Sequence, residues 1–453
     1  MIHSKQKSYI NNGANNISKG GLNAYSLAGI GIGGVIGGGF FLGSSLAIRE
    51  AGPSVIIAFL FGGLIMSQVL GSMTSISINR PVKGSFRVYA EQYMGKFTGF
   101  LLGWVIFISG ILTLGSEAIA AGIFLKYWIP NISSSIFSLA ALIIVIFINR
   151  LGTKYFGYIE SIMSIAKIAI IIFFVALGIF FISGNGILPP KNPFTSLTAF
   201  FPNGVSGFLQ SMLIVIFTYA GVSTVAMATS EVRNPRIEIP KATILLTIGI
   251  ILLYILSMFV IISTVSWNLI NTDISPFVQS FSNIGYGWAS ALINAVILVS
   301  TFSVMIGTYY SCVQILSSLS EANDAPKQLK IFTARGLLKY SWLTTGVISI
   351  LIVLIAFALG TKLFNYLISS SSYFSFFNWT VNLLTYIIWL KHREKNEIYD
   401  SPLIKGRLSA IITIIIIAVL LIISLGVSDF RIGFYIAFSI LVIVSVSYKF
   451  IKK

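Results

Sequence analysis

The chain has 453 residues, of which 56% are hydrophobic and only 9% are charged. This composition excludes a water-soluble domain of such length and is typical of a polytopic membrane protein. The net charge of +17 does not indicate nucleic-acid binding, because the basic residues are spread over short segments between apolar runs. The lipid bilayer is therefore the expected environment.

Twelve apolar runs cover most of the chain, and each is near the roughly 20 residues needed to cross a bilayer core. We expect an all-α fold with spanning helices at residues 23–48, 53–78, 97–125, 133–149, 155–182, 207–230, 242–266, 287–316, 341–360, 363–390, 408–427 and 432–449. The first run exceeds the usual apolar length of a signal peptide and should remain as a helix. Residues 1–22 then form an N-terminal tail.

The basic residues predict the topology. When the loops are assigned to alternate sides, most of the 30 Lys and Arg residues fall on one side. The other side holds only Arg49, Lys126, Lys191, Lys362 and Arg431. The positive-inside rule therefore places both termini in the cytoplasm of a multi-pass cell-membrane protein.

The first run contains the glycine-rich stretch GIGIGGVIGGGFFLG. Gly29, Gly33 and Gly37 repeat at the small-xxx-small spacing of close helix packing, but this explains one face only. Gly37, Gly38 and Gly39 are consecutive and point to three faces, so we expect a helix break there. Backbone N–H groups exposed at a break, beside the positive end of the following half-helix, suit a carboxylate.

Two charged residues lie deep in apolar runs. Lys167 is at the centre of the fifth run, where an unpaired lysine costs about 2.5 to 3.5 kcal/mol. This position indicates a transporter, or a lysine neutralised by Glu160 on the same helix face. The two interpretations are compatible. Burial disfavours its charge while carbonyls and carboxylates favour it, so the charge can follow conformation. Glu117, in the third run, should face the bundle interior, in a packing or a transport role.

A second break is predicted in the sixth run, where Gly221 interrupts an aromatic and hydroxyl-rich stretch. Helices one and six open successive five-helix blocks, and interrupted helices in matching positions indicate the central site of a transporter. Enzyme chemistry is not expected, because His3 and His392 lie in predicted cytoplasmic segments and no metal-ligand spacing is present. Cys312 is the only cysteine, so we expect no intrachain disulfide and no cysteine metal cluster. We also expect no metal and no cofactor.

The residues also resemble a known family, the amino acid permeases of the amino acid, polyamine and organocation transporter superfamily. The resemblance rests on the glycine-rich first helix and, in order, on RPVKGSFRVYAEQY, GSEAIAAGIFLKYWIP, FGYIESIMSIAKI, TSEVRNPRIEIPKA and DAPK. It implies a leucine-transporter-type fold that works by alternating access. Residues 23–400 would hold ten helices in two inverted repeats, and residues 401–453 helices 11 and 12 with a short cytoplasmic tail.

The resemblance also implies a substrate site. Gly37, Gly38 and Gly39 match the cradle for the substrate carboxylate, and the carbonyl groups near the sixth-helix break match the site for its amino group. That second part comprises Phe217, Thr218, Tyr219, Ala220 and Gly221. Phe217 would occlude the site, or serve as a core residue.

Lys167 matches the fifth-helix lysine that, in similar proton-coupled members, takes the place of a sodium ion. Glu117, Glu160 and Ser223 would support it. The chain departs from the family where glutamates are usual, at Ser72 and Ser223, and where many relatives carry an arginine, at Gln314. The resemblance therefore does not extend to gating by those carboxylates or to the residues of the inner gate.

The predicted function is proton-coupled transport of amino acids. No second acid lies near the predicted site to bind a cationic side chain, so neutral amino acids, apolar or small, are favoured. An exchanger of amino acid for amine, a nutrient sensor on the same fold, and an auxiliary subunit remain as alternatives. No obligatory protein partner is expected.

Overall fold

The computed structural model describes residues 23–82, 86–151, 153–183, 194–222, 232, 234–333 and 336–451, and for Ile30 and residues 151–161 it describes the backbone alone. In these ranges the chain is built from helices and loops without a β-strand, apart from one antiparallel bridge between Phe332 and Leu338. The predicted all-α class is confirmed for this part of the chain.

The helices follow the predicted apolar runs. In chain order they are α2 (Ala24–Val35), α3 (Gly38–Phe41) and α4 (Ser44–Ala51) for the first run, then α5 (Val55–Asn79), α7 (Lys96–Lys126), α8 (Ser134–Ile148), α9 (Thr153–Ile182), α11 (Gly204–Tyr219), α13 (Pro235–Thr264), α15 (Gly287–Glu321), α16 (Lys339–Leu354), α18 (Lys362–His392), α19 (Gly406–Ser424) and α20 (Ser428–Ile451). Four shorter helices are α6 (Arg87–Met94), α10 (Leu197–Phe200), α14 (Pro276–Asn283) and α17 (Ala356–Leu359).

Local signals explain where several helices begin. Asn23 caps α2, because its side-chain oxygen accepts a hydrogen bond from the backbone N–H of Ser26 at 2.9 Å. Pro235 and Pro276 begin α13 and α14, at the position where the missing N–H of proline costs no hydrogen bond.

Nine helical stretches in the described residues are long and apolar enough to cross a membrane. Three predicted spans do not meet these criteria, for different reasons. The α2 segment has 12 residues because the first helix is interrupted, and α8 has only 15 residues. The α18 helix has 31 residues, but its serine-rich sequence lowers its hydropathy. Twelve spans therefore remain a prediction.

The first apolar run is interrupted where the glycine run predicted a break. Ile36 and Gly37 have extended backbone conformations between α2 and α3. The chain then turns through α3 and continues as α4. This interruption leaves backbone polar groups inside the protein that must find partners elsewhere.

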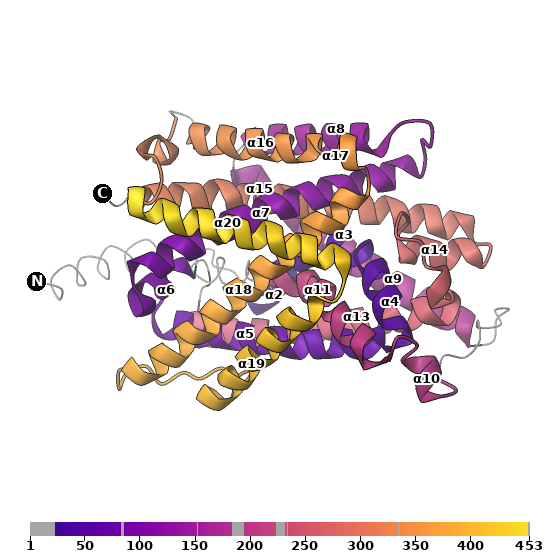
Figure 1. Cartoon of the computed structure of the whole chain (residues 1–453), viewed down its shortest axis with the longest axis horizontal. Helices are drawn as coiled ribbons and strands as arrows, with labels where there is room; N and C mark the ends of the chain where they lie inside the picture. The colour runs from indigo at the N-terminus through magenta and orange to yellow at the C-terminus, as the bar shows by residue number, and fades with distance from the viewer. Residues whose placement is uncertain are drawn as a thin grey trace, which may run out of the picture.

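The α7 helix lies in the middle of the molecule (Figure 1) and packs against α15, α18 and α8. A second group of helices forms around α13, which packs against α2, α5 and α9. The broken first helix contacts both groups, because α2 packs against α13 and α3 contacts α7, α11 and α15.

Aromatic rings pack around α14, which lies at the right end of the molecule in Figure 1. Phe277 of α14 packs against Phe40, Phe41 and Phe174, with ring centroids 5.1, 5.0 and 4.7 Å apart. Phe40 also stacks on Tyr254 at 3.7 Å. We call these five residues the aromatic plug. It separates the helix break from the α14 end of the protein.

Ion pairs join helix ends at the opposite end, where α6 lies. Arg80, after α5, pairs with Glu394 at 2.8 Å and also with Glu397, both after α18. The buried Arg87 of α6 lies 3.3 Å from Asp324, after α15. These contacts link segments that are more than 200 residues apart in the sequence.

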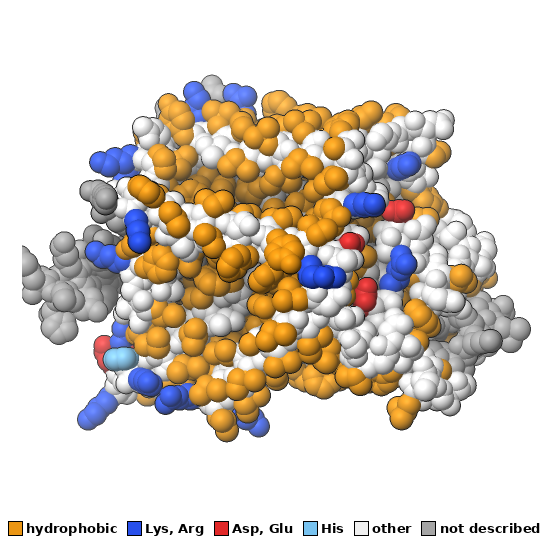
Figure 2. Space-filling view, viewed as in Figure 1, with side chains coloured by type: hydrophobic (Ala, Val, Ile, Leu, Met, Phe, Trp, Pro, Cys, Tyr) orange, Lys and Arg blue, Asp and Glu red, His pale blue; other side chains and the backbone are white. Residues whose placement is uncertain are grey.

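Apolar side chains cover the flanks of the molecule between these two ends (Figure 2). On α19 and α20, for example, Ile415, Ile422 and Phe438 are 57%, 66% and 55% exposed. A contiguous apolar surface of this kind is unfavourable in water but suits contact with lipid tails.

Candidate functional site

The backbone N–H groups exposed at the helix break bind a carboxylate, and this carboxylate belongs to the protein itself. Gly38 N donates to Glu117 Oε2 at 2.8 Å, and Gly39 N donates to Glu117 Oε1 at 3.2 Å. Glu117 is only 2% exposed. N–H groups that begin a helix carry partial positive charge and have no partner within the helix, so they stabilise the buried carboxylate.

The three consecutive glycines are required by close contacts. A Cβ atom at Gly37 would lie 2.8 Å from Glu117 Oε1, and one at Gly38 would lie 2.9 Å from Glu117 Oε2. At Gly39 the same atom would lie 2.5 Å from Cε1 of Phe217. Any side chain here would therefore displace the carboxylate or the aromatic ring.

Lys167 binds the other side of the break. Its Nζ donates to Gly33 O at 2.5 Å, and the side chain is completely buried. Ser300 Oγ donates to Ile36 O at 3.0 Å. Carbonyl groups that end a helix carry partial negative charge. The ammonium group of Lys167 and the carboxylate of Glu117 therefore complement the two ends of the interruption.

The sixth apolar run also loses its α-helical conformation near the predicted glycine. The α11 helix ends at Tyr219 and is followed by a 3₁₀ turn at Ala220–Val222. Thr218 O accepts a hydrogen bond from Tyr254 Oη at 3.2 Å. Phe217 is 7% exposed, and its ring lies against Gly39. The interruption of the first helix and the end of α11 thus meet at Gly39 and Phe217.

A cavity of about 190 Å³ begins at this meeting point. It follows α7 from Glu117 to Val105, a length of roughly 18 Å at the helical rise of 1.5 Å per residue. Phe86 and Trp379 line its far part, near the ion-paired end of the protein. The cavity therefore extends away from the aromatic plug.

The predicted site residues divide into four groups. Those that line the cavity are Gly39, Glu117, Phe217, Thr218, Ala220 and Gly221. Gly37, Gly38 and Lys167 lie at the break beside it, and Tyr219 is buried with its hydroxyl bonded to a backbone carbonyl of α5. Ser223 and the side chain of Glu160 lie outside the described residues. Ser72 is buried in α5 and donates to its own helix.

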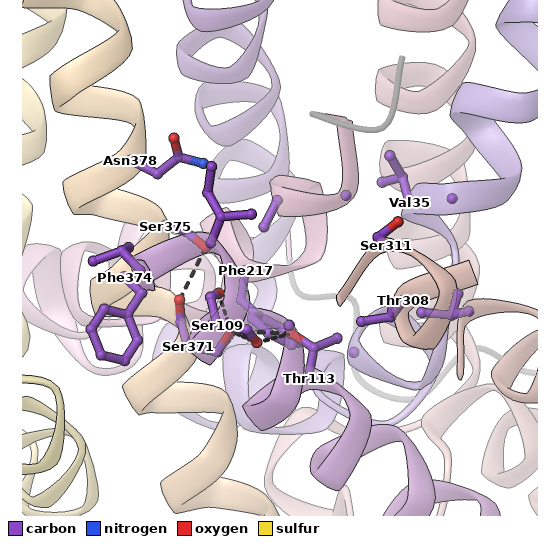
Figure 3. Close-up of a pocket in the computed structure, with 18 of the residues that line it drawn as sticks. Val35, Ser109, Thr113, Phe217, Thr308, Ser311, Ser371, Phe374, Ser375 and Asn378 are labelled. Carbon is purple, nitrogen blue, oxygen red and sulfur yellow. Dashed lines mark hydrogen bonds between the residues drawn. The ribbon is translucent and has the colours of Figure 1, made fainter. Parts of the chain in front are cut away.

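Sequence reasoning did not predict a group of hydroxyls on the cavity wall (Figure 3). Ser109 and Thr113 of α7 meet Ser371 of α18, with Oγ–Oγ distances of 3.0 Å for Ser109 and 3.2 Å for Thr113. Thr113 also donates to Ser109 O at 2.9 Å. We call these three residues the hydroxyl cluster. The run of four serines at 369–372, inside an apolar segment, was the signal that could have indicated it.

The described residues hold no group of three or more His, Cys, Asp or Glu side chains suited to a metal ion. Most of the cavity wall is apolar, and its polar groups are hydroxyls, the amide of Asn378 and the buried carboxylate of Glu117, which can orient a solute.

Comparison with known sequences identifies the family. Residues 27–453 match the Amino acid permease family. The chain belongs to this family. It is 31% identical to the uncharacterized amino acid permease YtnA of Bacillus subtilis (strain 168) over 380 residues, which are 82% of each chain. It is 29% identical to the amino-acid permease AapA of the same strain over 426 residues, 92% of each chain.

A further permease relative is the aromatic amino acid transport protein AroP of Escherichia coli (strain K12). The two are 28% identical over 429 residues, which are 94% of this chain and 93% of AroP. Membership in a family of transporters, together with the apolar helices, indicates an integral membrane protein and supports a role in amino acid transport. Transporters of this family are not enzymes.

Proposed function

We propose that the protein is a secondary active transporter that moves neutral amino acids across the cell membrane by proton symport. Its fold is proposed to be twelve spanning helices, with helices 1–10 as a five-plus-five inverted repeat and helices 11 and 12 appended. Both termini lie in the cytoplasm, and no obligatory protein partner is needed.

The carboxylate bound at the helix break carries this proposal. Gly38 N and Gly39 N already hold the carboxylate of Glu117 at the head of a cavity. The α-carboxylate of an amino acid has the same chemistry and would take these N–H groups when Glu117 leaves them. Phe217, Thr218 and Ala220 also line the cavity, and carbonyl groups of this segment would bind the amino group.

Proton coupling follows from competition between the two carboxylates. The α-carboxylate and a charged Glu117 repel each other and cannot share the same N–H groups. When Glu117 takes a proton it becomes neutral and releases them, so a proton and the substrate bind together. Lys167 completes the coupling pair, because its ammonium group at Gly33 O favours a negative charge at the break.

The cavity wall supports a neutral substrate. Among the described lining residues, Glu117 is the sole charged side chain, and it is engaged at the break. A cationic or anionic side chain would therefore enter the cavity without a free counter-charge, at a high desolvation cost. Aromatic amino acids, which the name of AroP indicates for that relative, are among the neutral candidates.

The arrangement of plug and cavity supports alternating access. The aromatic plug closes the α14 side of the site, while the cavity extends toward the ion-paired end. With both termini in the cytoplasm, this conformation opens inward. The outward-facing state would require separation of Phe277 from Phe40 and Phe41.

Uptake into proteoliposomes tests the proposal. Each common amino acid is offered with and without an inward proton gradient, in the absence of sodium. Accumulation that requires the gradient is the expected result. Uptake that occurs only into preloaded vesicles would replace symport by exchange, and no flux for any amino acid would refute the transport function.

A further inference from the structure

The absence of a free charged group in the cavity indicates a neutral substrate, and the hydroxyl cluster indicates which neutral side chains bind there. We propose that Ser109, Thr113 and Ser371 form the subsite for the substrate side chain, and that they select small neutral amino acids with a hydrogen-bond donor, namely a hydroxyl or a carboxamide. This inference rests on the proposed transport function and narrows its substrate class.

The hydrogen bonds inside the cluster determine what it can offer a ligand. Each hydroxyl has one proton and two lone pairs. Thr113 donates to Ser109 O, and Ser371 Oγ lies within hydrogen-bond distance of the hydroxyls of Ser109 and Thr113 and of Ser109 O. The proton of Thr113 is therefore used inside the cluster, and the contact between Ser109 and Ser371 uses one more. Lone pairs remain on the hydroxyl oxygens, so the cluster can accept a hydrogen bond from a ligand.

The position of the cluster fits a short side chain. Thr113 precedes Glu117 by one helical turn on α7, a distance of about 6 Å along the axis. A substrate whose carboxylate occupies the N–H groups of Gly38 and Gly39 starts at the level of Glu117. A side chain of one to three bonds, extended by a hydrogen bond of about 3 Å, spans that distance.

The position of the cluster in the cavity makes it selective. Ser371 is 1% exposed, Ser109 and Thr113 are partly exposed, and all three residues line the cavity. An apolar side chain placed here would cover the unused lone pairs without replacing the hydrogen bonds they make with water. A side chain with a hydroxyl or a carboxamide group donates a hydrogen bond to these lone pairs in place of water.

Threonine and valine provide the test, because they have nearly the same shape and differ in one hydroxyl. The kcat/KM for uptake of each is measured with the full-length protein in proteoliposomes. We expect threonine to be favoured by about tenfold, the ratio that one additional hydrogen bond supports. Serine against alanine should show the same direction.

Variants locate the effect. Thr113→Val and Ser371→Ala should each reduce the threonine preference severalfold, whereas Thr113→Ser should preserve it. Ser372→Ala is the matched control, because Ser372 is buried in α18, bonds to its own helix and does not line the cavity. The Ser372→Ala protein should prefer threonine over valine as strongly as the unmodified protein does.

The outcomes separate this inference from the proposed function. Equal kcat/KM for threonine and valine in the unmodified protein overturns the inference, and this measurement needs no variant to fold. An unchanged preference in an active Ser371→Ala protein does the same. If amino acids are transported without any such preference, the transport function stands; if none is transported, both fail.

Discussion

Replacement of Glu117 by glutamine tests proton coupling at the atoms that would carry it. Glutamine keeps the size and one carbonyl oxygen, but it removes the charge and places an NH₂ donor where the second oxygen was. Gly38 N lies 2.8 Å from the carboxylate, as expected for a charge-assisted hydrogen bond, whereas Gly39 N lies at the long limit of 3.2 Å. The variant therefore loses about one charge-assisted bond, worth about 1.5 to 3 kcal/mol.

This loss weakens the internal competitor of the substrate. Since about 1.4 kcal/mol corresponds to a tenfold change in affinity, substrate should bind the Glu117→Gln protein about 10- to 100-fold more tightly under conditions where the native Glu117 is charged. Glutamine does not take up a proton, so the affinity should no longer rise as the pH falls. A proton gradient should no longer drive accumulation, while exchange between loaded vesicles continues.

The assay is equilibrium binding of a radiolabelled amino acid to purified protein across acidic to alkaline pH, followed by uptake into proteoliposomes. Size-exclusion elution identical to that of the unmodified protein confirms that the variant is folded. Affinity that still increases at acidic pH, or gradient-driven accumulation at the original rate, would refute the competition between the two carboxylates.

Three further predictions concern other parts of the site. Lys167→Met should abolish pH-driven accumulation while leaving some exchange, measured by uptake and counterflow in proteoliposomes. Gly39→Ala should reduce uptake about tenfold, because the added Cβ would lie 2.5 Å from the ring of Phe217, and Phe217→Leu in the same chain should restore part of it. Glu397→Gln should destabilise the protein by about 1.5 to 3 kcal/mol, measured as a lower midpoint of thermal unfolding, because the buried Glu397 loses its charge-assisted bond to Arg80, which keeps its pair with Glu394.

Each of these predictions has a contradicting result. Lys167→Met with undiminished pH-driven uptake would remove the lysine from the coupling pair. If adding Phe217→Leu to the Gly39→Ala protein restores no uptake, the contact between the added Cβ and the Phe217 ring is not the cause of the lost uptake. An unchanged unfolding midpoint for Glu397→Gln would show that the ion pair adds no net stability.

The sequence by itself determined the class of protein and the place of the first interruption. Hydropathy predicts spanning helices because lipid offers no hydrogen-bond partners to the backbone. Three consecutive glycines predict a break because they point to three helix faces and cannot all serve packing. The extended backbone at Gly37 confirmed that break. The depth of Glu117 in an apolar run likewise indicated that its side chain faces the interior, where the structure places it.

Only the tertiary structure shows which residues from distant parts of the chain contact each other. Gly38 and Glu117 are separated by 79 residues, and Ser109 and Ser371 by 262, so no local pattern predicts that they meet. The sequence predicted an open carboxylate cradle, but the packing of α7 against the break delivers the side chain of Glu117 into it. The cavity has the same origin, because it is the volume left between α7, α15 and α18 once their side chains are packed. A sequence specifies which groups need partners, and the arrangement of the helices decides which partners they find.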